Sequence, residues 1–193
     1  MLVFDIETTG LNPLKNSITV VAVCDTETNS ETIYNFARDG CSRAEEFLCS
    51  LDVANVIACF NGVKFDLPFV IAFFGVAESR YRHWFCKVFD YYEYCRLLFD
   101  CPCSLNRLLC SNGYQVKTSC GGQAVTMAQN KQWRELEDYC MADTTKTRDL
   151  CVAVSVVLPL QKRNMTIKCT HLWSPSGMHS LDLVPHTPTQ ILS

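Results

Sequence analysis

The 193-residue sequence lacks three features that would assign it to a class at once. It has no basic excess, because 17 lysines and arginines stand against 20 acidic residues; this excludes a protein coated in positive charge but leaves a local basic groove open. Its longest apolar runs, 69–77 and 152–160, are far short of the roughly 20 residues that span a bilayer. It shows no secretory signal pattern, so we expect an intracellular protein of the cytoplasm or nucleus that is not secreted.

Cysteine, by contrast, is abundant, with 13 residues. An odd number cannot pair completely within one chain, and no CxxC pair occurs, so disulfide and structural-zinc scaffolds fit poorly. In a reducing compartment we expect thiols, several of them at apolar positions as small hydrophobic residues. A zinc-bound cysteine protein remains a minor alternative, and it would use the cluster Cys95, Cys101, Cys103 and Cys110.

The length and the 48% of hydrophobic residues suit one domain with a sizeable core. We expect that domain at residues 1–158. Residues 159–193 lose periodicity and contain several prolines, which indicates a C-terminal extension of unknown role, with one strand near 165–169.

The order of expected elements indicates an α/β fold. Three β-prone segments near the start predict an antiparallel meander, and two later strands would extend it in parallel, with helices on the sheet. The expected strands are 2–6, 17–25, 32–37, 55–60 and 84–90, and the expected helices are 42–51 with Ser42 as N-cap, 66–74, 104–113, about 122–129 and 131–157.

Acidic residues gather where these elements end. Asp5 and Glu7 alternate on the first strand, so their side chains share one face. Asp66 follows the fourth strand, and Tyr139 and Asp143 lie one turn apart on the last helix. Two acids together on an apolar strand repel each other, and a divalent metal is the simplest way to offset that repulsion.

Each of these residues alone has an ordinary explanation. An acid at a strand end is usually solvated, and Asp66 could be a helix cap. Together, four carboxylates from three elements can surround two hard cations, which is the arrangement used for in-line displacement at phosphorus. Residue types alone leave a structural Ca²⁺ or Mg²⁺ site open.

Three segments carry a family resemblance. FDIETTGL (4–11), NGVKFDLPF (61–69) and YCMADTTKTRDL (139–150) resemble, in order and spacing, the three motifs of the DnaQ-like DEDD 3′–5′ exonucleases. The form is close to the proofreading domains of family B DNA polymerases and their free-standing relatives. Tyr139, four residues before Asp143, resembles the tyrosine (DEDDy) branch. The resemblance covers residues 2–158 and implies an RNase H-like fold with a mixed five-stranded sheet.

The resemblance also implies roles for the acidic residues. Asp5, Glu7 and Asp143 would hold one divalent ion, Mg²⁺ or Mn²⁺. Asp5 would bridge to a second ion, which Asp66 would serve directly or through water. Tyr139 would orient the attacking water.

By the same resemblance, the substrate would be a single-stranded 3′ end, DNA rather than RNA, and the product a nucleoside 5′-monophosphate. The residues implied in substrate binding are Thr8, Thr9, Leu11, Asn61, Lys64 and Phe65. We expect a free-standing exonuclease or a subunit that serves a polymerase or a replication or repair complex in trans. An exoribonuclease of the same fold and a non-catalytic nucleic-acid-binding module remain alternatives.

Overall fold

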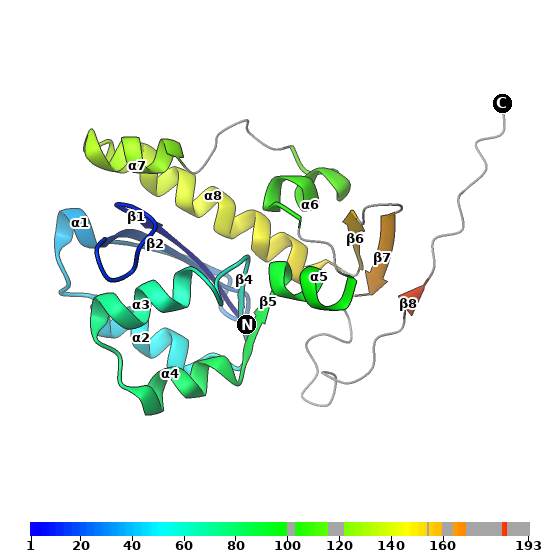
Figure 1. Cartoon of the computed structure of the whole chain (residues 1–193), viewed down its shortest axis with the longest axis horizontal. Coiled ribbons are helices and arrows are strands. Elements are labelled where there is room, and N and C mark those ends of the chain that lie inside the picture. The colour runs from blue at the N-terminus through cyan, green and yellow to red at the C-terminus, as the bar shows by residue number, and fades with distance from the viewer. Residues whose placement is uncertain (100–102, 116–121, 154, 160–163, 169–182, 185–193) are drawn as a thin grey trace.

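The computed structural model describes residues 1–99, 103–115, 122–153, 155–159, 164–168 and 183–184. Its centre is a five-stranded sheet in the order β3-β2-β1-β4-β5 (Figure 1). The strands are β1 (Leu2–Thr8), β2 (Ile18–Asp25), β3 (Ser30–Asn35), β4 (Ile57–Cys59) and β5 (Val88–Asp90). β1, β2 and β3 pair antiparallel, whereas β4 pairs parallel with both β1 and β5. The expected α/β fold with a mixed five-stranded sheet is confirmed.

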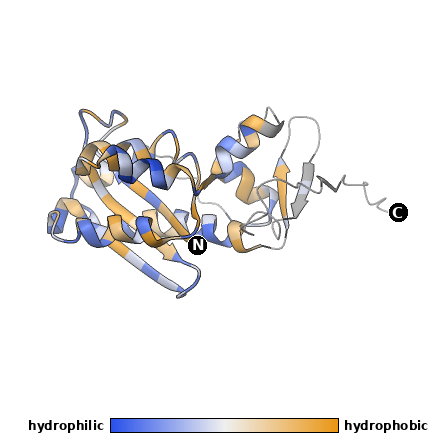
Figure 2. Cartoon of the chain, turned by 90° about the horizontal axis from the view of Figure 1, so that it is seen from below, coloured by the Kyte–Doolittle hydropathy of each residue, from blue (hydrophilic) through white to orange (hydrophobic). Residues whose placement is uncertain are grey.

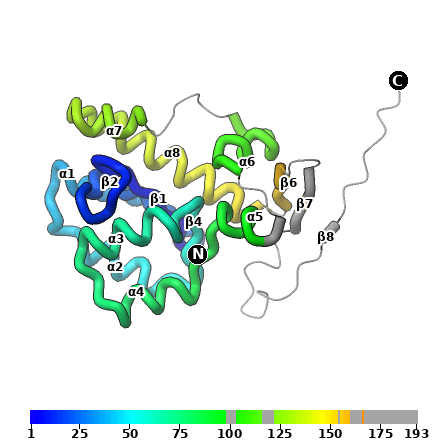
Figure 3. The backbone as a smooth tube through the Cα atoms, in the orientation of Figure 1, coloured from blue at the N-terminus to red at the C-terminus, as the bar shows by residue number. Residues whose placement is uncertain are grey.

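Helices cover both faces of this sheet (Figures 1 and 3). One face packs on α1 (Phe36–Asp39), α2 (Ala44–Val53), α3 (Asp66–Phe74) and α4 (Glu78–Phe85), and the other packs on α5 (Tyr91–Phe99), α6 (Leu105–Ser111), α7 (Gly122–Gln129) and α8 (Trp133–Val152). Successive side chains of β1 point to opposite faces of the sheet. Phe4 packs in the core under α2, α3 and α4, and Val3 packs in the core under α5, α6 and α8. Figure 2 shows largely hydrophobic strands between helices of mixed hydropathy.

A second, smaller sheet follows α8. It consists of β6 (Ser155–Pro159), β7 (Asn164–Lys168) and β8 (Leu183–Val184), paired antiparallel. Val156 and Leu158 of β6 are buried in the same core as Leu108 and Leu109 of α6. The strand expected near 165–169 is β7. The expected helix 131–157 is wrong at its end, because the β-branched segment 155–159 pairs with β7 instead of continuing the helix.

Other boundaries also differ from expectation. The strand expected over 84–90 shortens to β5, because Trp84 and Phe85 close α4, where the Trp84 indole donates to Asp52. Ser42 does not cap α2; Arg43 takes the N-cap position without a side-chain bond. Ser104 does cap α6, and Gly75 ends α3 in the left-handed region at φ 63°. No helix in the described ranges is both long and apolar enough to cross a membrane.

Candidate active site

Asp5 and Glu7 lie on the face of β1 that α8 covers. They follow Val3 at two-residue spacing, and α8 packs along β1 and β2. Ligand atoms of Asp5, Glu7 and Cys140 all lie within 4.8 Å of one another. The Cys140 thiol is buried and donates to the Asp5 backbone carbonyl at 3.5 Å. The expected pairing of Asp5 with Glu7 on one face is therefore present at the join of β1 and α8.

Asp66 reaches the same strand from the opposite layer. It opens α3, is 2% exposed, and its Oδ1 accepts the Ile6 amide at 3.1 Å. The parallel ladder between β1 and β4 includes only Leu2 and Val3, so the Ile6 amide lies beyond it and is available to a side chain. This bond places the Asp66 carboxylate beside the backbone between Asp5 and Glu7.

Asp143 and Tyr139 share one side of α8, as the spacing predicts. The Asp143 carboxylate lies close enough to Tyr139 for its charge to raise the pKa of the phenol. Lys146, one turn further along, places its Nζ 3.6 Å from Asp143 Oδ1. The motifs did not predict this ion pair, although the i,i+3 spacing of Asp143 and Lys146 signals it.

The four carboxylates repel one another. Burial, and then the charges of Asp66, Glu7 and Asp143, hold the pKa of Asp5 well above its ordinary value. Burial, followed by Asp143 and Asp66, raises the pKa of Glu7 to about 8. Burial raises the pKa of Asp66 to about 7. Such a group binds protons at neutral pH unless cations take their place.

The residues present fit divalent cations. Within the described part of the chain, Asp5, Glu7 and Asp66 form no ion pair with a basic side chain, so their charge is not offset by the protein. Carboxylate oxygens are the hard ligands that Mg²⁺ and Mn²⁺ prefer. Burial raises the pKa of the Cys140 thiol well above its ordinary value, so Cys140 stays a protonated neighbour of Asp5 and the oxygen set fits a hard cation.

The residues expected at the terminal nucleotide lie in two loops. After β1, the Thr8 hydroxyl donates to the Gly10 carbonyl at 2.6 Å, and the Thr9 hydroxyl accepts the Ser17 amide at 3.0 Å. These bonds brace a loop on which Leu11 is 84% exposed. Leu11 is therefore available to a ligand, whereas the two threonine hydroxyls serve the loop.

The second loop precedes α3. Asn61 adopts a positive φ of 63°, which asparagine tolerates better than most residues. The Phe65 ring packs 4.9 Å from Phe69 and is partly buried. Lys64 is exposed but pairs with Glu93 at 2.8 Å. Lys64 therefore has a protein partner that a phosphate would have to replace.

The cysteine cluster of the zinc alternative is not assembled by the described residues. Cys95 and Cys103 are buried together in one core, but Cys110 is exposed, and Cys101 lies outside the described residues. The described part of the chain holds one cluster of metal-ligand type, the one at Asp5.

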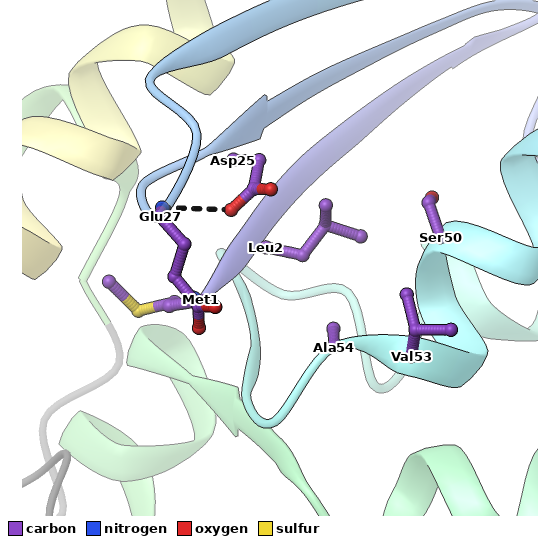
Figure 4. A pocket seen from close by; sticks show the side chains of 7 residues that line it. All are labelled: Met1, Leu2, Asp25, Glu27, Ser50, Val53 and Ala54. Carbon is purple, nitrogen blue, oxygen red and sulfur yellow. Dashed lines mark hydrogen bonds and ion pairs between the residues drawn. The ribbon is translucent and has the colours of Figure 1, made fainter.

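A separate pocket lies at the other end of β1. Its lining includes Met1, Leu2, Asp25, Ser50 and Val53 (Figure 4). Leu2 begins the strand that carries Asp5 and Glu7 toward its far end. The pocket is thus distinct from the carboxylate group.

Comparisons with known proteins agree with this architecture. A model of the RNase H superfamily matches residues 2–155. The fold is similar to that of the family B DNA polymerase from the hyperthermophilic archaeon Pyrobaculum calidifontis, with a TM-score of 0.58 and 17% identity over 77% of this chain and 24% of the polymerase. It is also similar to a nuclease solved in its apo form, with a TM-score of 0.52 and 19% identity over 77% of this chain and 68% of the nuclease. No curated protein matches the sequence.

Proposed function

The chain belongs to the RNase H superfamily, and from that premise we propose that it is a metal-dependent 3′–5′ exonuclease of the DEDDy type. It would hydrolyse phosphodiester bonds from the 3′ end of single-stranded DNA and release nucleoside 5′-monophosphates. The observation that supports the proposal is the pairing of Asp5 and Glu7 on one face of β1, near enough to Asp66 of α3 and Asp143 of α8 for their charges to act on both. Acidic side chains placed so close together repel one another, and bound cations would offset this repulsion.

Each acid has a place in this proposal. Asp5, Glu7 and Asp143 would hold one cation, and Asp5 with Asp66 a second, with Mg²⁺ or Mn²⁺ as the ion. Two such ions supply a water of lowered pKa and stabilise the leaving oxygen. The protein supplies the positions: the β1 backbone holds Asp5 and Glu7, the bond from the Ile6 amide holds Asp66, and Lys146 pairs with Asp143.

Tyr139 acts as a hydrogen-bond donor in this scheme. Burial, and then the charge of Asp143, raises the pKa of its phenol further above the ordinary value of 10.0. In the metal-free protein the hydroxyl is therefore protonated at neutral pH, and it is available as a hydrogen-bond donor. It can orient a water molecule and hold the Asp143 carboxylate.

Tyr139→Phe is expected to lower kcat by about 10- to 100-fold, because one positioning hydrogen bond is lost while all four carboxylates remain. Mn²⁺ binding should stay close to wild type. Cleavage of a 3′-labelled oligonucleotide and Mn²⁺ binding, measured side by side, check both parts. A variant of unchanged rate would remove Tyr139 from the proposed machinery.

The nucleic acid would meet the site through the two loops. Leu11 is exposed where an apolar contact to the last base is proposed, and Phe65 offers a partly exposed ring for stacking. Thr8, Thr9 and Asn61 would act through the loop backbone that they shape. Lys64 would exchange Glu93 for a backbone phosphate.

The choice between DNA and RNA depends on how the channel receives a 2′-hydroxyl. Matched 3′-labelled DNA and RNA oligonucleotides, incubated with Mg²⁺ or Mn²⁺, test the proposal. Faster loss of 3′ nucleotides from DNA supports it, and faster loss from RNA favours the exoribonuclease alternative. Absence of metal-dependent cleavage on either would favour a non-catalytic binding module.

The organisation of the chain is part of the same proposal. Residues 1–158 would form the nuclease domain, and 159–193 an extension. A polymerase, or a replication or repair complex, would be served in trans. Co-purification with and without residues 159–193 would show whether the extension recruits such a partner.

A further inference from the structure

The loop that leads to Asp66 has little freedom. Asn61 has a positive φ, and a Cβ added at Gly62 would stand 2.6 Å from Cys59 Sγ and 3.4 Å from Asp66 Oδ2. The Gly62 carbonyl accepts the Leu67 amide at 2.8 Å, which joins the loop to the first turn of α3. A shift of this loop therefore moves Asp66.

Asp90 holds the loop from the neighbouring strand. It ends β5 and is 5% exposed. Its Oδ1 accepts the Asn61 amide at 2.7 Å and the Tyr92 amide at 2.9 Å, and its Oδ2 accepts the Val63 amide at 3.0 Å. One carboxylate thus ties the loop before α3 to the first turn of α5.

Asp90 also contributes charge. It is the ladder partner of Cys59, the last residue of the strand that leads into the loop before Asp66. A negative charge close to Asp66 favours the binding of a cation there and disfavours the binding of an anion. The hydrogen bonds of Asp90 and its negative charge therefore both favour a cation beside Asp66.

We propose that Asp90 is a positioning residue that sets the place of Asp66 through the loop at Asn61–Val63 and so determines how tightly a divalent cation is held beside Asp66. The inference deepens the proposed function and rests on it. Asp90 would act through backbone amides, as outer hydrogen-bond partners of metal ligands do.

The test compares Asp90→Asn with Asp52→Asn. Asparagine keeps one acceptor oxygen and loses the charge and the second acceptor. Asp52 is a matched control, because its carboxylate on α2 also accepts hydrogen bonds, in this case from Arg80 and Trp84 of α4. These contacts lie away from the four acids. Mn²⁺ binding followed by electron paramagnetic resonance gives a readout that needs no catalysis.

Asp90→Asn is expected to weaken Mn²⁺ binding at one site, and to lower kcat, by about 10-fold or more, the range seen when outer partners of metal ligands are lost. Asp52→Asn should lower the melting temperature and leave both quantities unchanged. The proposal is overturned if Asp90→Asn only lowers the melting temperature.

Two further results keep the outcomes distinct. If Asp90→Asn does not fold, Gly62→Ala is used instead, because it displaces the same loop and leaves Asp90 intact. This variant should also lose Mn²⁺ binding. If it binds Mn²⁺ as tightly as the wild-type protein does, the proposal is overturned. If wild-type protein binds no Mn²⁺ and cleaves nothing, the proposed function itself fails. If the wild-type protein binds Mn²⁺ and the Asp90→Asn variant binds it equally well, the positioning role of Asp90 is rejected and the proposed function stands.

Discussion

Replacing Asp5 by Asn is expected to abolish cleavage and, at the same time, to make the metal-free protein harder to unfold. Asp5 is the proposed ligand shared by both cations, and an amide is a poorer ligand for a hard ion than a carboxylate. Cation stabilisation of the transition state is worth several kcal/mol, so the rate should fall by at least about 10³-fold.

The expected gain in stability follows from the same carboxylate. Asp5 is repelled by Asp66, Glu7 and Asp143 within a buried site. Asparagine has nearly the same shape without the charge, so the repulsion disappears while the packing against Cys140 remains. We expect the melting temperature in a chelator to rise by about 5 °C, in line with about 2 kcal/mol for a domain of this size.

Both effects are measurable on one preparation. Release of 5′-mononucleotides from a 3′-labelled oligonucleotide gives the rate, and thermal unfolding with a chelator gives the stability. Glu27→Gln is a suitable control, because Glu27 is exposed and its side chain forms an ion pair with the Met1 amino group, away from the four acids. Retained cleavage would exclude Asp5 as a ligand, and a lower melting temperature would assign its carboxylate a structural role.

Short-range periodicity predicted the placements that depend on one element. The two-residue spacing of Asp5 and Glu7 places both on one face of β1, and the four-residue spacing of Tyr139 and Asp143 places both on one side of α8. These relations are set by backbone geometry alone. They hold regardless of what packs around the element.

Contacts between distant elements were not predictable in this way. Asp90 stands in the short strand before α5, and nothing in its neighbourhood along the chain shows that its carboxylate will bind amides near Asn61. Segment 155–159 is a different case, because its valines favour a strand and it pairs with β7, the next strand along the chain. The amide contacts of Asp90, by contrast, depend on tertiary structure.

The metal-free protein is expected to lose stability as pH rises from about 5 to about 8, with a divalent cation restoring it. Glu7 has a pKa of about 8 in the fold against an ordinary 4.5, and Asp66 about 7 against 3.8. Below the ordinary values both the folded and the unfolded chain hold these protons. Between the two values only the folded chain holds them, so each rise in pH favours the unfolded state.

Acids whose pKa is lowered do not produce this trend. The pKa of Glu93 is lowered to about 2, chiefly by its hydrogen bond from Arg96, so its contribution is fully present above its ordinary 4.5 and is lost only in stronger acid. A loss of stability confined to the range between about pH 5 and 8 therefore reports the raised carboxylates. Glu7→Gln should flatten the trend, because glutamine cannot titrate.

Divalent cations should raise the melting temperature most at the pH values where the repulsion among the carboxylates is greatest. They bind the ionised carboxylates, so the increase in melting temperature on adding Mn²⁺ should grow from about pH 5 to about pH 8, as the folded protein gives up protons to bind the ion. Thermal unfolding at several pH values, with a chelator or with Mn²⁺, measures both trends. A metal-free protein that is most stable near pH 8 would contradict the buried repulsion on which the proposed cation site depends, because Asp5, Glu7 and Asp66 cannot all ionise there at no cost.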